Sequence, residues 1–140
     1  MKQTFEGKIG RTLEDSEAWF PEPPHPGEDA PNVIFVLLDD TGFAQFGCYG
    51  SEIDTENVNS LAQNGLQFTN FHVTPLCSPT RASLLTGRSQ HAVGMRGVSN
   101  WQSGFPHQLG HISNHAGTIA EVLSSKGYAT FCTGKWHLAP

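Results

Sequence analysis

The segment "TPLCSPTRASLLTGR", residues 74–88, holds the side chains best suited to chemistry. Arg81 has the wrong sign for the start of the short helix expected here, because a helix N-terminus carries partial positive charge. With Ser78 as N-cap and Pro79 as the first helical residue, Cys77 and Arg81 lie four residues apart on one face. The free amides and the guanidinium then form a site for a tetrahedral oxyanion, with Cys77 as a nucleophile at its mouth. The local pattern equally allows a buried thiol beside a surface arginine.

Two other polar clusters follow expected strands. Asp39 and Asp40 come directly after the apolar run 32–38, and two adjacent carboxylates repel each other unless a cation such as Ca²⁺ or Mg²⁺ holds them. Lys135 and His137 share a face of extended chain, where they could bind an anion and supply a general acid. Taken singly, a solvated turn and ordinary surface residues are the commoner outcomes. Because the carboxyl ends of parallel strands meet at one edge, the coincidence favours a single site.

The elements that must position these residues follow from hydrophobic periodicity and from glycine stops. The chain predicts strands over 32–38, 66–73 and 128–134 and helices over 55–65, 79–86 and 117–127. Residues 89–115 are rich in glycine, histidine and aromatics without a clear period and are predicted to be loop. This order indicates an α/β fold with a mostly parallel sheet between helices.

Composition narrows the class of protein. The 140 residues suit one domain, and 37% hydrophobic with 15% charged residues describe a soluble globular chain. The net charge of −5 argues against nucleic acid as a partner, and no apolar run is long enough to span a membrane. Three widely spaced cysteines predict neither a zinc site nor a disulfide framework. The N-terminus lacks the apolar core of a secretory signal, so we expect a cytoplasmic protein with mostly surface histidines.

Two regions are expected along the chain. Residues 1–31 are polar and then proline-rich, which predicts an extended N-terminal arm. Residues 32–140 form the folded part, which ends directly after a strand with no closing element. A parallel sheet covered on both faces needs more chain, so we expect a fragment of a larger domain.

Three stretches together carry a family resemblance. "CSPTRASLLTGR" resembles the sulfatase signature, "NVIFVLLDDTGFAQFGCYG" is similar to the family's first strand and metal-binding aspartates, and "GKWHL" is similar to its downstream lysine and histidine segment. They occur in the family's order across residues 32–138. The resemblance is to type I sulfatases of the alkaline-phosphatase-like superfamily, arylsulfatases in particular, and implies their α/β fold, incomplete in this chain.

The resemblance also implies a chemistry for the opening segment. Cys77 would be converted to formylglycine by a formylglycine-generating enzyme, for which Pro79 and Arg81 are part of the recognition signal. One hydroxyl of the hydrated aldehyde would attack the sulfur of a sulfate ester and displace its alcohol. The other would lose its proton and expel sulfate, which a plain alcohol could not do. Arg81 would hold the modified residue and balance its charge.

The remaining roles follow in the same way from the resemblance. Asp39, Asp40 and residue 77 would bind Ca²⁺, which would polarise the sulfate oxygens. Lys135 would bind sulfate and stabilise the transition state, and His137 would orient or protonate on the substrate side. Further family ligands and catalytic residues lie downstream of these motifs, so this chain alone is expected to be inactive. The alternatives are a formylglycine-dependent phosphonate monoester or phosphodiester hydrolase, and a non-enzymatic remnant with an unmodified thiol.

Overall fold

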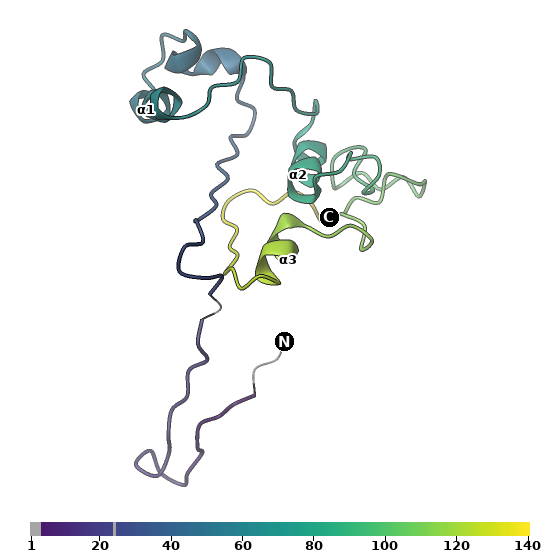
Figure 1. The fold of residues 1–140 in the computed structure, drawn as a ribbon. Helices are drawn as coiled ribbons and strands as arrows, with labels where there is room; N and C mark the ends of the chain where they lie inside the picture. Colours follow the sequence, from purple (N-terminus) through teal and green to yellow (C-terminus); the bar gives the residue numbers. More distant parts are fainter. Residues whose placement is uncertain (1–3, 24) are drawn as a thin grey trace. The chain divides into compact units, whose positions relative to one another are not determined.

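The computed structural model describes residues 4–23 and 25–140, and Figure 1 follows their elements along the chain. The described residues contain the short 3₁₀ helices η1 (Phe43–Gln45) and η2 (Gly47–Tyr49) and the helices α1 (Glu56–Asn64), α2 (Cys77–Thr86) and α3 (Ile119–Ser124). They divide into two compact units. The first comprises the described residues up to Pro31 together with Ala120–Phe131, and the second comprises Asn32–Ile119 and Cys132–Pro140. Among the residues that the structure describes, no helix is both long and apolar enough to cross a membrane.

The first unit contains a short antiparallel bridge near the N-terminus. The Lys8 amide donates to the Glu17 carbonyl at 3.0 Å, and the Glu17 amide donates back to Lys8 at 2.8 Å. Phe5 and Trp19 pack edge to face beyond this bridge, with their ring centroids 6.0 Å apart. These contacts turn the N-terminal segment back on itself.

The helices of the second unit lie close to where the sequence predicts them. Helix α1 occupies the expected segment, although Gly65 at its end has extended backbone at φ −132°. Helix α2 begins two residues earlier than expected, with Leu76 rather than Ser78 as N-cap. Pro79 is therefore the third helical residue, where its missing N–H leaves no hydrogen bond unmade. Gly87 ends α2 in left-handed conformation at φ 63°, as its sequence position indicates.

The predicted parallel sheet is not confirmed. The described residues hold only two isolated bridges, Lys8 with Glu17 and Met95 with Gln108, and no strand ladder. The apolar segment 32–38 is extended but unpaired, and it exposes Ile34 by 82% and Val36 by 80%. A strand needs a neighbouring strand for its amide and carbonyl groups, and this segment has none.

The core of the second unit is small and packs against one side of α2. Ala82, Val93, Met95 and Leu138 are its fully buried hydrophobic residues, and Leu85 packs against them. The segment 89–115 contains no helix or strand, as expected, but it supplies two of these four core residues. Figure 1 shows this segment coiling beside α2.

Candidate active site

A pocket of about 380 Å³ opens at the start of α2. Its walls come from the end of the extended segment, from the approach to α2 and from the first turn of that helix, and they are formed by residues 37–42, 73–77, Thr80 and Arg81. This one pocket is thus lined by Cys77, Arg81, Asp39 and Asp40. The two clusters that the sequence places at a strand end and at a helix start are brought together.

Lys135, from the third predicted cluster, contacts this site through Asp39. The Lys135 ammonium lies 2.5 Å from one carboxylate oxygen of Asp39, and Arg81 lies 3.4 Å from the other. Arg81 also donates to the Lys135 carbonyl at 2.5 Å. Asp39 is separated from Arg81 by 42 residues and from Lys135 by 96, so these contacts join three distant stretches of sequence.

The charges of this cluster shift one another's protonation. The hydrogen bond from Lys135 and, with smaller effect, the contact with Arg81 lower the pKa of Asp39 below its ordinary value of 3.8. The hydrogen bond to Asp39 raises the pKa of Lys135 above 10.5. Both groups are partly exposed, so solvent screens the pair and its contribution to stability is small.

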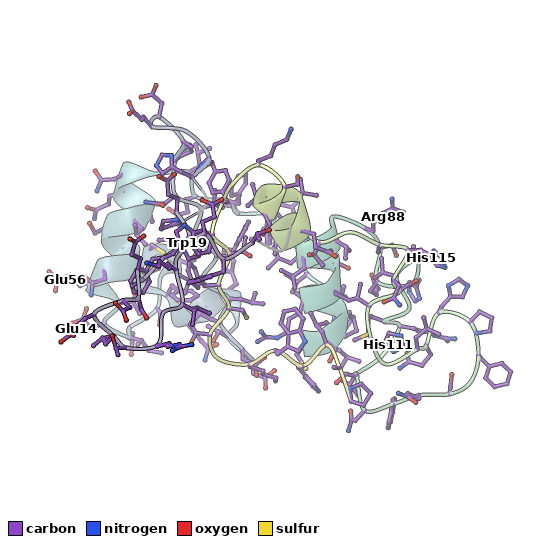
Figure 2. All side chains as sticks on the ribbon, turned by 90° about the horizontal axis from the view of Figure 1, so that it is seen from below. Glu14, Trp19, Glu56, Arg88, His111 and His115 are labelled. Carbon is purple, nitrogen blue, oxygen red and sulfur yellow. The ribbon has the colours of Figure 1, made fainter. Side chains whose placement is uncertain are left out.

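Cys77 and His137 form the second contact of the site. The Cys77 sulfur lies 3.2 Å from Nδ1 of His137, across 60 residues of sequence. His137 is the one histidine of the seven that is not exposed. Figure 2 labels two of the exposed histidines, His111 and His115, in the segment 89–115. The expectation that most histidines lie on the surface is confirmed, and the exception lies beside the candidate nucleophile.

The backbone of the site is strained at two residues. Asp40 at φ 51° and His137 at φ 53° adopt left-handed conformations that are uncommon for residues other than glycine. In the described residues, His107 is the only other non-glycine residue with positive φ. Such strain persists where surrounding contacts enforce it, and it is found preferentially at functional sites.

The donor set of the pocket fits part of a hard-cation site. Asp39 and Asp40 provide carboxylate oxygens, which Ca²⁺ and Mg²⁺ prefer, and Asp39 already binds the ammonium of Lys135. In residues 4–23 and 25–140, however, no group of three or more His, Cys, Asp or Glu side chains could hold a metal ion. The predicted ligands Asp39, Asp40 and Cys77 line one pocket without forming a closed coordination shell, since Ca²⁺ takes six to eight oxygens.

Two site residues were not predicted from the sequence. Thr74 and Thr80 line the pocket, and their hydroxyl oxygens lie 2.6 Å apart. Thr80 also donates to the carbonyl of Thr74 at 3.1 Å and so ties the first turn of α2 to the segment before it. Nothing in the residue types marks these threonines, because hydroxyl side chains near a helix start usually serve as caps.

The chain resembles proteins of one family. The model of the Sulfatase family matches residues 31–140. Arylsulfatase A of Homo sapiens is 43% identical over 111 residues, which is 77% of this chain and 21% of that protein. An uncharacterized sulfatase of Schizosaccharomyces pombe is 37% identical over 115 residues, with the same two shares. Arylsulfatase of Klebsiella aerogenes is 33% identical over 114 residues, 79% of this chain and 24% of that protein.

Proposed function

The chain belongs to the sulfatase family, and on this premise we propose that it forms the nucleophile-bearing part of a sulfuric ester hydrolase acting on aryl or similar sulfates. It spans about a fifth of the length of the curated relatives that it matches, so the activity is proposed for a full-length domain. That domain would supply further metal ligands and the strands that pair with segment 32–38. The observation that carries the proposal is the convergence of Cys77, Arg81, Asp39, Lys135 and His137 at one place.

The anion-binding groups come from α2 and from Lys135. At the start of α2, the amides of Cys77 and Ser78 precede the intrahelical hydrogen bonds and favour a negatively charged ligand. Pro79 has no amide hydrogen, and the Thr80 amide donates to the Leu76 carbonyl at 3.1 Å. In the part of the chain that the structure describes, the buried Nε of Arg81 has no hydrogen-bond partner. A buried donor without a partner is unfavourable, so we propose that it meets an oxygen of the bound ester. Lys135 would neutralise the charge that develops on the sulfate oxygens.

Residue 77 is suited to carry the nucleophile. It is the first residue of α2, lines the pocket and is half-buried. As formylglycine it would supply a hydrated aldehyde, with one hydroxyl for attack on sulfur and a second for release of sulfate. His137 Nδ1 lies at 3.2 Å from the present sulfur, which is within reach to accept or return a proton at this residue or to protonate the departing alcohol oxygen.

Asp39 and Asp40 are the residues proposed to hold Ca²⁺. The ion would supply a Lewis acid that polarises sulfate oxygens and favours the ionised nucleophile. Asp39 would then exchange the ammonium of Lys135 for the metal, which leaves Lys135 free for the substrate. Both residues line the pocket that residue 77 also lines, which supports this assignment.

The modification is tested by peptide mass spectrometry of the full-length gene product that contains this chain. Co-expression with a formylglycine-generating enzyme is expected to convert Cys77 and to leave Cys48 and Cys132 as thiols. A Cys77 that remains a thiol under these conditions would refute the formylglycine assignment and favour a non-enzymatic anion-binding role.

The reaction is tested with the same protein on an aryl sulfate and an aryl phosphodiester in parallel. A higher kcat/KM for the sulfate is expected, with activity lost after chelation and restored by Ca²⁺. A higher kcat/KM for the phosphodiester would overturn the choice of sulfate and favour a phosphodiester or phosphonate monoester hydrolase with the same modified residue. The Cys77→Ala variant, which cannot be modified, is the control for background hydrolysis.

A further inference from the structure

Ser78, the residue next to the candidate nucleophile, is fastened to a different part of the chain. It is fully buried, and its hydroxyl accepts a hydrogen bond from the Ser99 amide at 3.2 Å. The sequence predicts Ser78 as the N-cap of α2, but the helix begins one residue before it and its hydroxyl makes no capping bond. Its hydroxyl instead connects the first turn of α2 to the turn at residues 97–101.

One side chain makes three hydrogen bonds to that turn, in addition to the turn's own bond from the Trp101 amide to the Val98 carbonyl. Oε1 of Gln108 accepts a hydrogen bond from the Gly97 amide at 2.5 Å. Nε2 of Gln108 donates to the carbonyls of Val98, at 3.3 Å, and Trp101. Gln108 is only 8% exposed, so it has little access to water and its amide is satisfied by these three backbone groups. Loss of the side chain would remove the partner of the buried Gly97 amide and that of the Trp101 carbonyl, whereas the Val98 carbonyl would keep its bond from the Trp101 amide at 3.0 Å.

The surrounding backbone fits this arrangement closely. A Cβ on Gly97 would lie 3.2 Å from Oε1 of Gln108, and a Cβ on Gly110 would lie 2.5 Å from the Ser99 carbonyl oxygen. Gly110 is buried and has φ 76°, so both space and conformation require glycine there. Ser99 is therefore held by Ser78 on its amide side and by the close approach of Gly110 on its carbonyl side.

The residue before Gln108 is strained. His107 has φ 72°, its ring Nδ1 lies 2.7 Å from the carbonyl oxygen of His91, and its own carbonyl accepts from the Arg96 amide at 2.9 Å. The other two non-glycine residues with positive φ in the described chain are Asp40 and His137, both at the candidate site. Strain at His107 is maintained by contacts on both its side chain and its backbone, which fix where Gln108 enters the turn.

We propose that Gln108 is a positioning residue for the nucleophile: through the turn 97–101 and the Ser99–Ser78 hydrogen bond, it sets the placement of residue 77 against His137. Gln108 does not touch the substrate in this role. Deleting its amide loosens the turn, releases Ser78 and lets the first turn of α2 shift. A displacement of about 1 Å at a reacting group lowers turnover by about 100-fold.

The kinetic test compares five variants of the full-length enzyme, each normalised to its formylglycine content by mass spectrometry; this arm rests on the proposed function. Gln108→Leu and Ser78→Ala are expected to lower kcat on an aryl sulfate about 10- to 100-fold. Inhibition by inorganic sulfate, which Arg81 and Lys135 would bind, is expected to stay near the wild-type value. Ser78→Thr keeps the hydroxyl and is expected to retain most of the activity.

The matched control is Val93→Ala, which removes buried volume from the same core and leaves the hydrogen bonds of Gln108 in place. Its kcat is expected to remain near wild type although the protein is less stable. The double variant Gln108→Leu/Ser78→Ala is expected to fall no further than the more severe single variant, because both act through one path. A kcat loss in Gln108→Leu that is no greater than in Val93→Ala, or additive losses in the double variant, would overturn the proposal.

A second arm does not depend on sulfatase activity. In full-length protein made without the formylglycine-generating enzyme, the alkylation rate of Cys77 is measured relative to the exposed Cys132. Gln108→Leu and Ser78→Ala are expected to raise this ratio severalfold, because Cys77 loses its half-buried position against His137. An unchanged ratio, or an equal rise in Val93→Ala, would show that Gln108 does not position residue 77. If the wild-type protein shows no turnover, the proposed function is rejected. The alkylation experiment then decides by itself whether Gln108 positions residue 77.

Discussion

Asp39 divides its carboxylate between two cations from distant parts of the chain. One oxygen contacts Lys135 and the other contacts Arg81, so neither cation approaches the pocket without a counter-charge. Asp40, the next residue, has a left-handed backbone conformation, and so has His137, which lies two residues after Lys135. The site therefore combines paired charge with backbone strain, as sites that bind charged ligands often do.

The Lys135→Gln substitution is predicted to raise the pKa of Asp39 toward 3.8, because the largest cause of its lowering is the Lys135 hydrogen bond. A ¹³C NMR titration of the Asp39 carboxyl measures this change directly. Arg88→Gln is the matched control, since Arg88 is exposed beyond the end of α2 (Figure 2) and forms no ion pair with Asp39. A titration of Asp39 that is unaffected by Lys135→Gln would contradict the ion pair.

The same pair predicts a sign for the pH dependence of stability. The pKa of Asp39 is lowered on folding, so its contribution is present above 3.8 and is lost as the pH falls through its folded pKa. The pKa of Lys135 is raised on folding, so its contribution is present below 10.5 and is lost as the pH rises through its folded pKa. The stability difference between wild type and Lys135→Gln, measured by denaturant unfolding, should be largest between these limits and shrink on the acid side. A difference that grows below pH 3.8 would reverse this sign.

The Arg81→Lys substitution is predicted to lower kcat by about 100-fold or more, the loss found when a donor to a developing oxyanion is removed. One guanidinium nitrogen contacts the Lys135 carbonyl and another contacts Asp39, whereas a lysine ammonium presents its donors from a single nitrogen and lacks the planar fork that serves both contacts here. Steady-state kinetics of the full-length protein, normalised to modified Cys77, gives the value. Near-normal turnover would remove Arg81 from the site.

Residue types and order predicted that Cys77, Arg81, Asp39 and Lys135 would lie close together, because the ends of parallel strands were expected to meet at one edge. The structure brings these side chains together without a sheet, and their roles in a site stay predictions. The contact between Cys77 and His137 could not be predicted in the same way, because it depends on the left-handed turn at His137. Residues with positive φ other than glycine leave no reliable mark in a sequence.

At the scale of elements, α2 was well predicted because its stop signal is local. Gly87 has φ 63° with its amide bonded to the Ser83 carbonyl at 2.9 Å, and no atom lies within 4 Å of a Cβ built there. Its start was displaced because Pro79 is tolerated anywhere in the first turn, so the sequence leaves a choice of register.

The Gly87→Ala substitution is predicted to lower the free energy of unfolding by about 1 kcal/mol. The loss is conformational, because an added methyl group would meet open space at this position. Gly117→Ala is the matched control, since it also faces open space but has no positive φ, and it should be neutral or slightly stabilising. Urea unfolding of both variants measures the difference, and equal effects would contradict the left-handed cap.

At the scale of the whole molecule, burial of apolar residues is uneven. Ile34 and Val36 are largely exposed on an extended and unpaired segment, while the buried hydrophobic residues gather beside α2. An apolar run with unpaired backbone groups is a surface on which another strand can add. This argument concerns residues 32–38 as a contiguous stretch, since single exposed hydrophobic residues are common on proteins.

The 140-residue chain is therefore predicted to self-associate, and the double substitution Ile34→Lys/Val36→Lys is predicted to reduce this association. Light scattering coupled to size-exclusion chromatography gives the mass. Ile9→Lys/Leu13→Lys adds the same charge at exposed residues outside the apolar run and is the matched control. An equal reduction by both pairs would attribute the effect to net charge rather than to the segment.

The folded arrangement of residues 89–115 was the part that the sequence could not predict. Hydrophobic periodicity marks helices and strands, and this segment has neither, although it buries Val93 and Met95. Its order comes from backbone hydrogen bonds to one glutamine and from glycines at close approaches, features that depend on the fold already being formed. The parallel sheet remains a prediction for the full-length domain, because strand pairing is a property of neighbours rather than of one segment.

Each of three buried residues directly follows a residue of the candidate site in the sequence. Ala82 follows Arg81, Leu138 follows His137, and the buried Ser78 follows Cys77. Selection for a more stable protein and selection for a new substrate would consequently act on adjacent codons and oppose each other there. Libraries meant to broaden specificity should be compensated by stabilising substitutions in the other unit, which contains the Lys8–Glu17 bridge.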